Sequence, residues 1–502
     1  MNTTAQKRTD NGSLIAVCLA ALMFGFEISS VPVSLSAIEK ELHGSFKDLQ
    51  WIMNAYTIAC TTVLMAAGTL ADKYGRKRIF IINTILFGIT SLACGLAQDI
   101  YTLIGSRFLQ GLSGGAMFIC AIANLSSRFS HGKARARAFS VWGVIVGIGL
   151  GFGPVIGSSI MSFLSWRWIF LVHAPLALFT ILPGVSFIRE SKDPLAKRLD
   201  TAGMLLLAIS VFTLTWYIIQ GAGAGFTSIG IITVLSVFIL SFILFIIVEK
   251  KVPHPMFDFS VFRISDFSGA IMGSIGMNFS FWPFIIYLPI LLQAGFGYSV
   301  VSTGMCLLAY TLPSLIVPPL AEYLTLRYKA RNVIPCGLLM IGAGFLLMRY
   351  GSMTTNASWR TILPGMLLSG IGLGMTNTPV TNTATGTVSQ DRAGMASGID
   401  TSARLITLAL NIALMGSILV NGLLSQVKSI APHIEPQQLY ALAERIAAGD
   451  DTVTGVTGLS RSQTQVMLIK AFGNLLLFGG LGAMLLALCS FWLFHSKRKH
   501  GA

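Results

Sequence analysis

The chain repeats one feature fourteen times, a stretch of about 20 residues that is almost wholly apolar. A segment of that length spans the hydrocarbon core of a bilayer as an α-helix, which satisfies its own backbone polar groups. Only 11% of the 502 residues are charged, against about 25% in soluble domains. We therefore expect an all-α integral membrane protein with 14 transmembrane helices. The predicted spans are 14–38, 51–71, 79–97, 101–125, 138–160, 167–188, 201–220, 227–248, 267–292, 301–324, 332–349, 361–387, 393–421 and 467–495.

The distribution of basic residues predicts how the chain crosses the membrane. If both termini are cytoplasmic, most lysines and arginines fall on inner segments, such as DKYGRKR (72–78), RFSHGKARAR (128–137) and RESKDPLAKR (189–198). Basic residues are enriched in the cytoplasmic segments of membrane proteins. We expect a multi-pass protein of a bacterial inner (plasma) membrane with both termini cytoplasmic. The net charge of +15 then requires no nucleic-acid partner.

The spans form two groups of six, separated by two additional spans. The expected segments are an N-terminal six-helix bundle (1–190), two inserted helices with a cytoplasmic connector (191–266), and a C-terminal six-helix bundle (267–502). Basic turns follow corresponding spans in the two groups, an internal similarity typical of duplicated transporters. Within the last segment, residues 422–466 are expected to form a long exterior loop, in which QQLYALAERIAAG favours a helix.

Three motifs carry glycines at fixed spacings, and two of them also contain charged residues. GTLADKYGRKR (68–78) is expected to form a basic turn between two helices. LIGSRFLQGLSGGA (103–116) places Arg107 inside a span. GIGLGFGPVIGS (147–158) has a glycine spacing that allows close helix contact, and its Pro154 removes one backbone donor and bends the helix.

These motifs resemble those of the major facilitator superfamily, in its fourteen-helix drug:proton antiporter branch, whose members include quaternary-ammonium and multidrug exporters. The resemblance covers nearly the whole chain and implies a major facilitator fold of two six-helix bundles plus two inserted helices. It also implies a proton-coupled antiporter that exports lipophilic, often cationic drugs or biocides by alternating access. The residues expected to serve conformational change or gating are Gly68, Asp72, Gly75, Arg76, Lys77, Gly149, Gly153, Pro154 and Gly157.

The chain departs from the pattern of this branch at several positions. In FEISSVPVSLS (26–36), Glu27 takes the place of the usual aspartate and Pro32 that of the usual asparagine. His173 stands where asparagine is common in the branch. The fold that the resemblance implies is compatible with these changes, which bear instead on the identity of the substrate.

Four charged residues fall well inside spans: Glu27, Arg107, Asp400 and Arg404. A charge in hydrocarbon is costly, and desolvation favours the protonated form of a carboxyl group. A proton and a cationic substrate then compete for one acidic site, which is the minimal chemistry of antiport. We therefore expect Glu27 and Asp400 to carry protons, anchor cations or both.

Each of these charges has a structural alternative. Glu27 can form a purely structural pair with a polar neighbour. Asp400 lies four residues before Arg404 on one helical face, where the two can form an ion pair. Arg107 either borders the proton path, as the resemblance implies, or anchors backbone carbonyls.

Aromatic and amide side chains within the spans are further candidates for a substrate site, because aromatic rings attract cations and amides suit a hydrated cavity wall. For each aromatic residue, ordinary packing in the core is the alternative. The candidates are Tyr56, Asn278, Trp282, Asn377 and Asn382.

The sequence also excludes several functions. No nucleotide-binding, zinc-protease or paired catalytic motif is present, so the chain is not expected to be an enzyme. Its seven cysteines stand singly, which argues against a metal site, and the proton gradient takes the place of a cofactor. The expected partners are protons, a small-molecule substrate and the bilayer, and the expected state is a monomer. Two alternatives are a proton-driven exporter of a specific metabolite or siderophore, with Arg107 as anion anchor, and a non-transporting membrane sensor.

Overall fold

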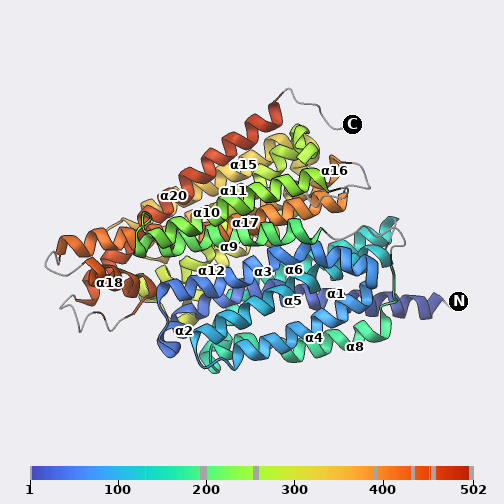
Figure 1. Cartoon of the computed structure of the whole chain (residues 1–502), viewed down its shortest axis with the longest axis horizontal. Helices are drawn as coiled ribbons and strands as arrows, with labels where there is room; N and C mark the ends of the chain where they lie inside the picture. Colours follow the sequence, from blue (N-terminus) through green and yellow to red (C-terminus); the bar gives the residue numbers. More distant parts are fainter. Residues whose placement is uncertain are drawn as a thin grey trace. The chain divides into compact units, whose positions relative to one another are not determined.

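The computed structural model describes residues 3–129, 132–192, 200–252, 259–388, 393–430, 436–450, 453 and 460–496, so parts of the basic segments 128–137 and 189–198 lie outside it. Every element within the described residues is helical (Figure 1). The elements of the first half are α1 (Thr3–Ser30), η1 (Val31–Ser34), α2 (Leu35–Leu42), α3 (Phe46–Tyr74), α4 (Arg76–Gly95), α5 (Ile100–Arg128), α6 (Gly132–Phe163), α7 (Arg167–Leu171), α8 (His173–Phe187), α9 (Thr201–Ala224) and α10 (Ile229–Lys251). Those of the second half are η2 (Phe259–Arg263), α11 (Ser265–Ile290), η3 (Leu291–Gly295), α12 (Val300–Thr311), α13 (Pro313–Ile316), α14 (Pro318–Tyr328), α15 (Ala330–Ser352), α16 (Trp359–Gly386), α17 (Ala393–Ile430), α18 (Pro436–Ala448) and α20 (Arg461–His495).

The chain is an all-helical, multi-pass membrane protein, but 14 spans are not confirmed. Among the described residues, 11 helices are long and apolar enough to cross a bilayer, and two bent helix pairs raise the number to 13. The remaining predicted span, 361–387, corresponds to α16. That helix has 28 residues and sufficient length, but the run of threonines, asparagines and glycines in GMTNTPVTNTATG lowers its hydropathy.

The chain divides into two compact units. Unit 1 comprises residues 1–34, 51–209 and 241–256, and unit 2 comprises residues 35–50, 210–240 and 257–502. Within unit 1, α1 packs against α5, α6 and α8, and α4 packs against α5 and α8. Within unit 2, α11 packs against α15, α16, α17 and α20. The division at residues 190 and 266 stays a prediction.

Glycines bring α1 and α6 into backbone contact. A Cβ atom added at Gly149 would lie 2.9 Å from the Leu22 carbonyl oxygen, and one added at Gly25 would lie 3.0 Å from that of Val146. Small residues allow such approaches between membrane helices. Gly157 also faces α1, where an added Cβ would lie 2.9 Å from the Ser30 Cβ. The helix continues through Pro154.

Unit 2 contains a second backbone contact, between α15 and α16. An added Cβ at Gly344 would lie 2.6 Å from the Gly365 carbonyl oxygen, and one at Gly337 would lie 2.8 Å from that of Gly372. At these two close approaches the polar helix α16 packs directly against the more apolar helix α15. The α16 backbone is therefore buried by protein along one side.

Unit 2 also holds residues 35–50 from the start of the chain. The Gln50 side-chain amide donates to the Ile412 carbonyl at 3.0 Å and to the Tyr287 hydroxyl at 3.1 Å. The Gln50 Nε2 occupies the space that a side chain at Gly416 would need. These contacts fix the first turns of α3 to α11 and α17.

The predicted exterior loop 422–466 is shorter than expected in the described residues. The helix α17 continues to Ile430, and α20 begins at Arg461 after a capping box formed by Ser460 and Gln463. The expected helix in this region is α18. Its Glu444 forms an ion pair with Lys47 at 3.3 Å, so α18 contacts the first turn of α3.

Candidate proton and substrate site

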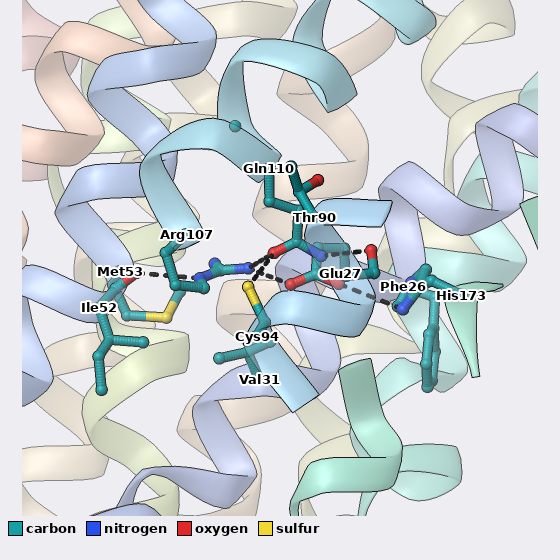
Figure 2. A network of polar contacts seen from close by, with 12 residues as sticks. Phe26, Glu27, Val31, Ile52, Met53, Thr90, Cys94, Arg107, Gln110 and His173 are labelled. Carbon is teal, nitrogen blue, oxygen red and sulfur yellow. Dashed lines mark hydrogen bonds and ion pairs between the residues drawn. The ribbon is translucent and has the colours of Figure 1, made fainter. Parts of the chain in front are cut away.

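Glu27 lies in the interior of unit 1, on α1, and is fully buried. One of its carboxylate oxygens, Oε1, forms an ion pair and hydrogen bond with the Arg107 guanidinium of α5 (Figure 2). A buried carboxylate without a partner costs several kcal/mol. Two of the four charges that the sequence places inside spans therefore compensate each other, although 80 residues separate them.

Arg107 is itself held on several sides. Its Nη1 donates to the Gln110 side chain at 2.7 Å, and its Nε donates to the Ile52 carbonyl at 3.1 Å. Gln110 in turn donates to the Ser91 hydroxyl at 2.9 Å. The structural alternative considered for Arg107, a contact with a backbone carbonyl, is therefore present, and its place beside a proton path stays a prediction.

Tyr56 contributes to this cluster through its ring. The Arg107 guanidinium carbon lies 4.4 Å from the ring centroid, a cation–π contact between two buried side chains. One face of the Tyr56 ring therefore lies against Arg107, and the contact of Tyr56 with a substrate stays a prediction.

His173 completes the cluster from α8 and is also fully buried. Its Nδ1 lies 3.3 Å from the second Glu27 oxygen, Oε2 (Figure 2). Its Nε2 lies 3.3 Å from the Met23 carbonyl oxygen. The sequence marked His173 only as a departure from a family pattern. A histidine within an apolar run gives no indication of its partner, because Glu27 lies far away along the chain.

A second charged cluster lies in unit 2, around Asp400 of α17. Asp400 is buried, and Arg404 donates to its two oxygens from Nε at 3.1 and 3.2 Å. The i,i+4 ion pair considered from the sequence is therefore present. Ser274 of α11 and Thr381 of α16 also donate to the carboxylate, so three helices meet at one acid.

The amide and aromatic candidates of unit 2 differ in their placement. Asn377 joins the cluster, since its side-chain oxygen accepts a 2.5 Å hydrogen bond from Arg404 Nη1. The buried Asn278 donates to the Ser274 carbonyl at 3.0 Å, one turn away on the same helix. Asn382 is exposed, and Trp282 is half-buried beside Phe281. The structure brings Asn377 to Asp400 and leaves Asn382 outside the cluster.

The turn between α3 and α4 is built on the 68–78 motif. Gly75 has φ +119°, a conformation that favours glycine. Asp72 pairs with Arg76 at 2.8 Å. Lys77 donates from Nζ to the Val185 carbonyl at 2.6 Å. At Gly68, however, an added Cβ would meet Ile119 at 3.6 Å, an ordinary contact, so glycine is not required there for close approach.

Glu190 is a residue of this turn that the sequence did not single out. Its carboxylate accepts hydrogen bonds from the backbone N–H groups of Lys77 at 3.0 Å and Arg78 at 3.1 Å. An acidic group suits the start of a helix, where N–H groups lack partners. Glu190 follows α8, so only the tertiary fold brings it to α4.

Residues 16–411 match the model of the Major Facilitator Superfamily. The chain belongs to this superfamily. It is accordingly a membrane transporter of small molecules and not an enzyme, as the motifs predicted.

Several relatives within the superfamily are named as resistance proteins. The chain is 33% identical to the multidrug resistance protein Stp of Mycobacterium tuberculosis over 444 residues, which cover 88% of this chain and 82% of that protein. It is 31% identical to the puromycin resistance protein pur8 of Streptomyces alboniger, with 81% of each chain covered. Among solved structures, tetrameric PepTSo2 superposes with a TM-score of 0.61 at 12% identity, covering 96% of this chain and 97% of that one. That likeness concerns the superfamily fold alone.

Proposed function

We propose that this superfamily member is a proton-coupled antiporter that exports lipophilic, often cationic drugs or biocides by alternating access. In this proposal 14 helices cross a bacterial inner membrane, with both termini cytoplasmic. The bundles 1–190 and 267–502 rock about the inserted segment 191–266. Relatives named for multidrug and puromycin resistance support the substrate class.

The main support for the proposal is the burial of Glu27 together with the lack of a hydrogen bond, within the described part of the chain, at one of its oxygens. Its carboxylate is fully buried, yet its Oε2 has no hydrogen-bond partner among the described residues. A buried polar atom without a hydrogen bond is uncommon and costly. A site that takes up a proton, and releases it when a cation arrives, accounts for such an atom.

Arg107 sets the charge of the proposed site. With Glu27 ionised, the pair is neutral, and protonation of the carboxyl group leaves the arginine charge uncompensated. A protonated site therefore repels a cation, and an ionised site tolerates one. This difference makes proton and cation binding mutually exclusive, as antiport requires.

The unit 2 cluster has a different role in this proposal. Asp400 is already bound by Arg404, Ser274 and Thr381. We assign it to holding α11, α16 and α17 together. Asn278, Trp282 and Asn377 would then line the substrate path beside that cluster.

The test is cation-driven proton movement in inverted membrane vesicles, with a lipophilic cationic dye as substrate. Glu27→Gln is expected to abolish it, whereas Glu27→Asp, which keeps the carboxylate, is expected to retain it. Glu322→Gln makes the same change at an exposed glutamate of α14 and serves as the control. Normal coupling in a folded Glu27→Gln protein would exclude the proposed role.

The same vesicles distinguish export of a specific metabolite or siderophore. In that alternative Arg107 would anchor an anion, but its charge is balanced here by Glu27. A panel of cationic dyes and anionic metabolites decides between the two. Proton movement with the cations alone is the expected result.

A further inference from the structure

We propose that Glu27 and His173 form one proton-binding site, in which a single proton lies between Glu27 Oε2 and His173 Nδ1 and fastens α8 to α1. The inference rests on the proposed function and deepens it, because it names the group that shares the transported proton. It assigns to His173 a positioning and proton-holding role.

The first step is the geometry of the two facing atoms. Glu27 Oε2 and His173 Nδ1 lie 3.3 Å apart, and both side chains are fully buried. Neither atom has a hydrogen-bond partner elsewhere among the described residues. A proton between them would satisfy both, whereas two facing lone pairs repel each other.

The second step is the other nitrogen of the imidazole ring. His173 Nε2 lies 3.3 Å from the Met23 carbonyl oxygen, which can only accept a hydrogen bond. Nε2 must therefore carry a hydrogen, and a neutral ring then presents a lone pair at Nδ1. The contact with Glu27 requires one additional proton, held as a carboxylic acid beside imidazole or as a carboxylate beside imidazolium.

Among the described residues around the Glu27–His173 pair, the positive charge of Arg107 compensates the Glu27 carboxylate. The charged and titratable side chains around it, in the described part of the chain, are Arg107 from α5, Tyr56 and Cys60 from α3, and Cys94 from α4. The rings of Phe26 and Phe87 each lie 5.4 Å from the imidazole. Arg107 balances the carboxylate, so the shared proton changes the net charge of the cluster from zero to +1.

The third step is what happens when the proton leaves. A neutral imidazole carries one hydrogen, which stays on Nε2 beside the Met23 carbonyl, so the contact of Nδ1 with Glu27 is lost. Both partners lie on α1, four residues apart. Proton loading therefore strengthens the contact between α1 and α8, and proton release weakens it.

The experiment measures the pair without substrate, in purified full-length protein. Infrared difference spectra follow the Glu27 carboxyl band, identified by its absence in Glu27→Gln. Nitrogen-15 NMR follows the imidazole of His173, identified by its absence in His173→Asn. We expect both signals to change at the same pH, with Nε2 carrying a hydrogen throughout.

Substitution of the histidine gives the decisive comparison. Asparagine can donate to Glu27 but does not hold a proton, and Arg107 then favours the carboxylate. In His173→Asn the carboxyl band is expected to change at a pH lower by about 1–2 units. His495→Asn, at the end of α20, is the control, and His173→Gln replaces His173→Asn if that variant does not fold.

The outcomes separate this inference from the proposed function. A carboxyl band unaffected by either His173 substitution, or an imidazole that titrates at a different pH from the carboxyl group, overturns the shared proton even if transport depends on Glu27. A coupled titration in a protein that moves no cation supports the shared proton and overturns the proposed function alone.

Discussion

Ser29 of α1 donates a hydrogen bond from its hydroxyl to the Gly149 carbonyl of α6 at 2.9 Å. The same hydroxyl fills the space that a side chain at Gly153 would need. The two helices that carry Glu27 and the 147–158 motif are thus joined by direct contact without large side chains.

Gly153→Ala is expected to destabilise the protein by about 1–3 kcal/mol, because the new methyl group displaces Ser29. Gly149→Ala should cost more, since its neighbours are backbone atoms of Leu22 and Phe26 at 2.9 and 3.0 Å. Thermal unfolding of the purified protein measures both effects. Gly143→Ala, where nothing lies within 4 Å of the added Cβ, is the control in the same helix.

Ser29→Ala combined with Gly153→Ala is expected to recover part of the lost stability, because the displaced hydroxyl is then absent. A double variant as unstable as Gly153→Ala alone would contradict the assignment of the clash to Ser29.

Asp400→Asn is expected to lower the stability of unit 2 by roughly 3 kcal/mol, because Arg404 is left as a half-buried cation without its acid. Asp400→Asn with Arg404→Gln should cost less than the sum of the single changes. The free energies of unfolding of the unchanged protein, the two single variants and the double variant, measured by chemical unfolding, give the coupling in this double-mutant cycle. A selective loss of divalent or bulky cations with unchanged stability would instead indicate that Asp400 binds substrate.

Glu190→Gln is expected to weaken the start of α4 by about 1 kcal/mol, because the backbone N–H groups of Lys77 and Arg78 lose a charged acceptor. Amide hydrogen exchange at these two residues should become about fivefold faster. Glu322→Gln serves again as the matched substitution. Unchanged exchange would show that the carboxylate is not needed at this turn.

The packing of α18 is expected to become less stable as the pH rises, because the buried Glu444 then loses its proton. Burial raises the pKa of Glu444 above its ordinary value of 4.5, although Lys47 opposes the shift. The folded form therefore binds more protons than the unfolded form at pH values above about 4.5, so stability falls as the pH rises through that range. Hydrogen exchange in α18, measured across this range, tests the expectation.

Two substitutions separate the contributions to that pH dependence. Glu444→Gln should remove it, and Lys47→Gln should steepen it because burial of the acid is then unopposed. Equal pH dependence in all three proteins would assign the effect to another group.

The sequence predicted the helical spans well because each depends on a local property, apolar length. The exception is α16, whose polar run GMTNTPVTNTATG lowers its hydropathy below that of the apolar spans. Gly75 was also predictable, since a tight turn between helices needs a residue that adopts positive φ.

The partners of the buried charges were less predictable. The Asp400–Arg404 pair follows from helical spacing, but the contacts of Glu27 with Arg107 and His173 join three helices far apart along the chain. Tyr56 was expected to face a substrate, whereas its ring lies against Arg107. Such contacts depend on tertiary packing, which spacing along one chain does not determine.

The polarity of α16 has a consequence for biogenesis. Membrane insertion favours helices by their apolar content, and threonines, asparagines and glycines at the helix centre oppose it. The paired glycines allow α15 to pack closely against α16. This packing covers part of α16 with protein, which lipid would not do. We expect the two helices to enter the bilayer as a hairpin, so that α16 placed alone after an unrelated helix would remain outside the membrane in a glycosylation-mapping assay.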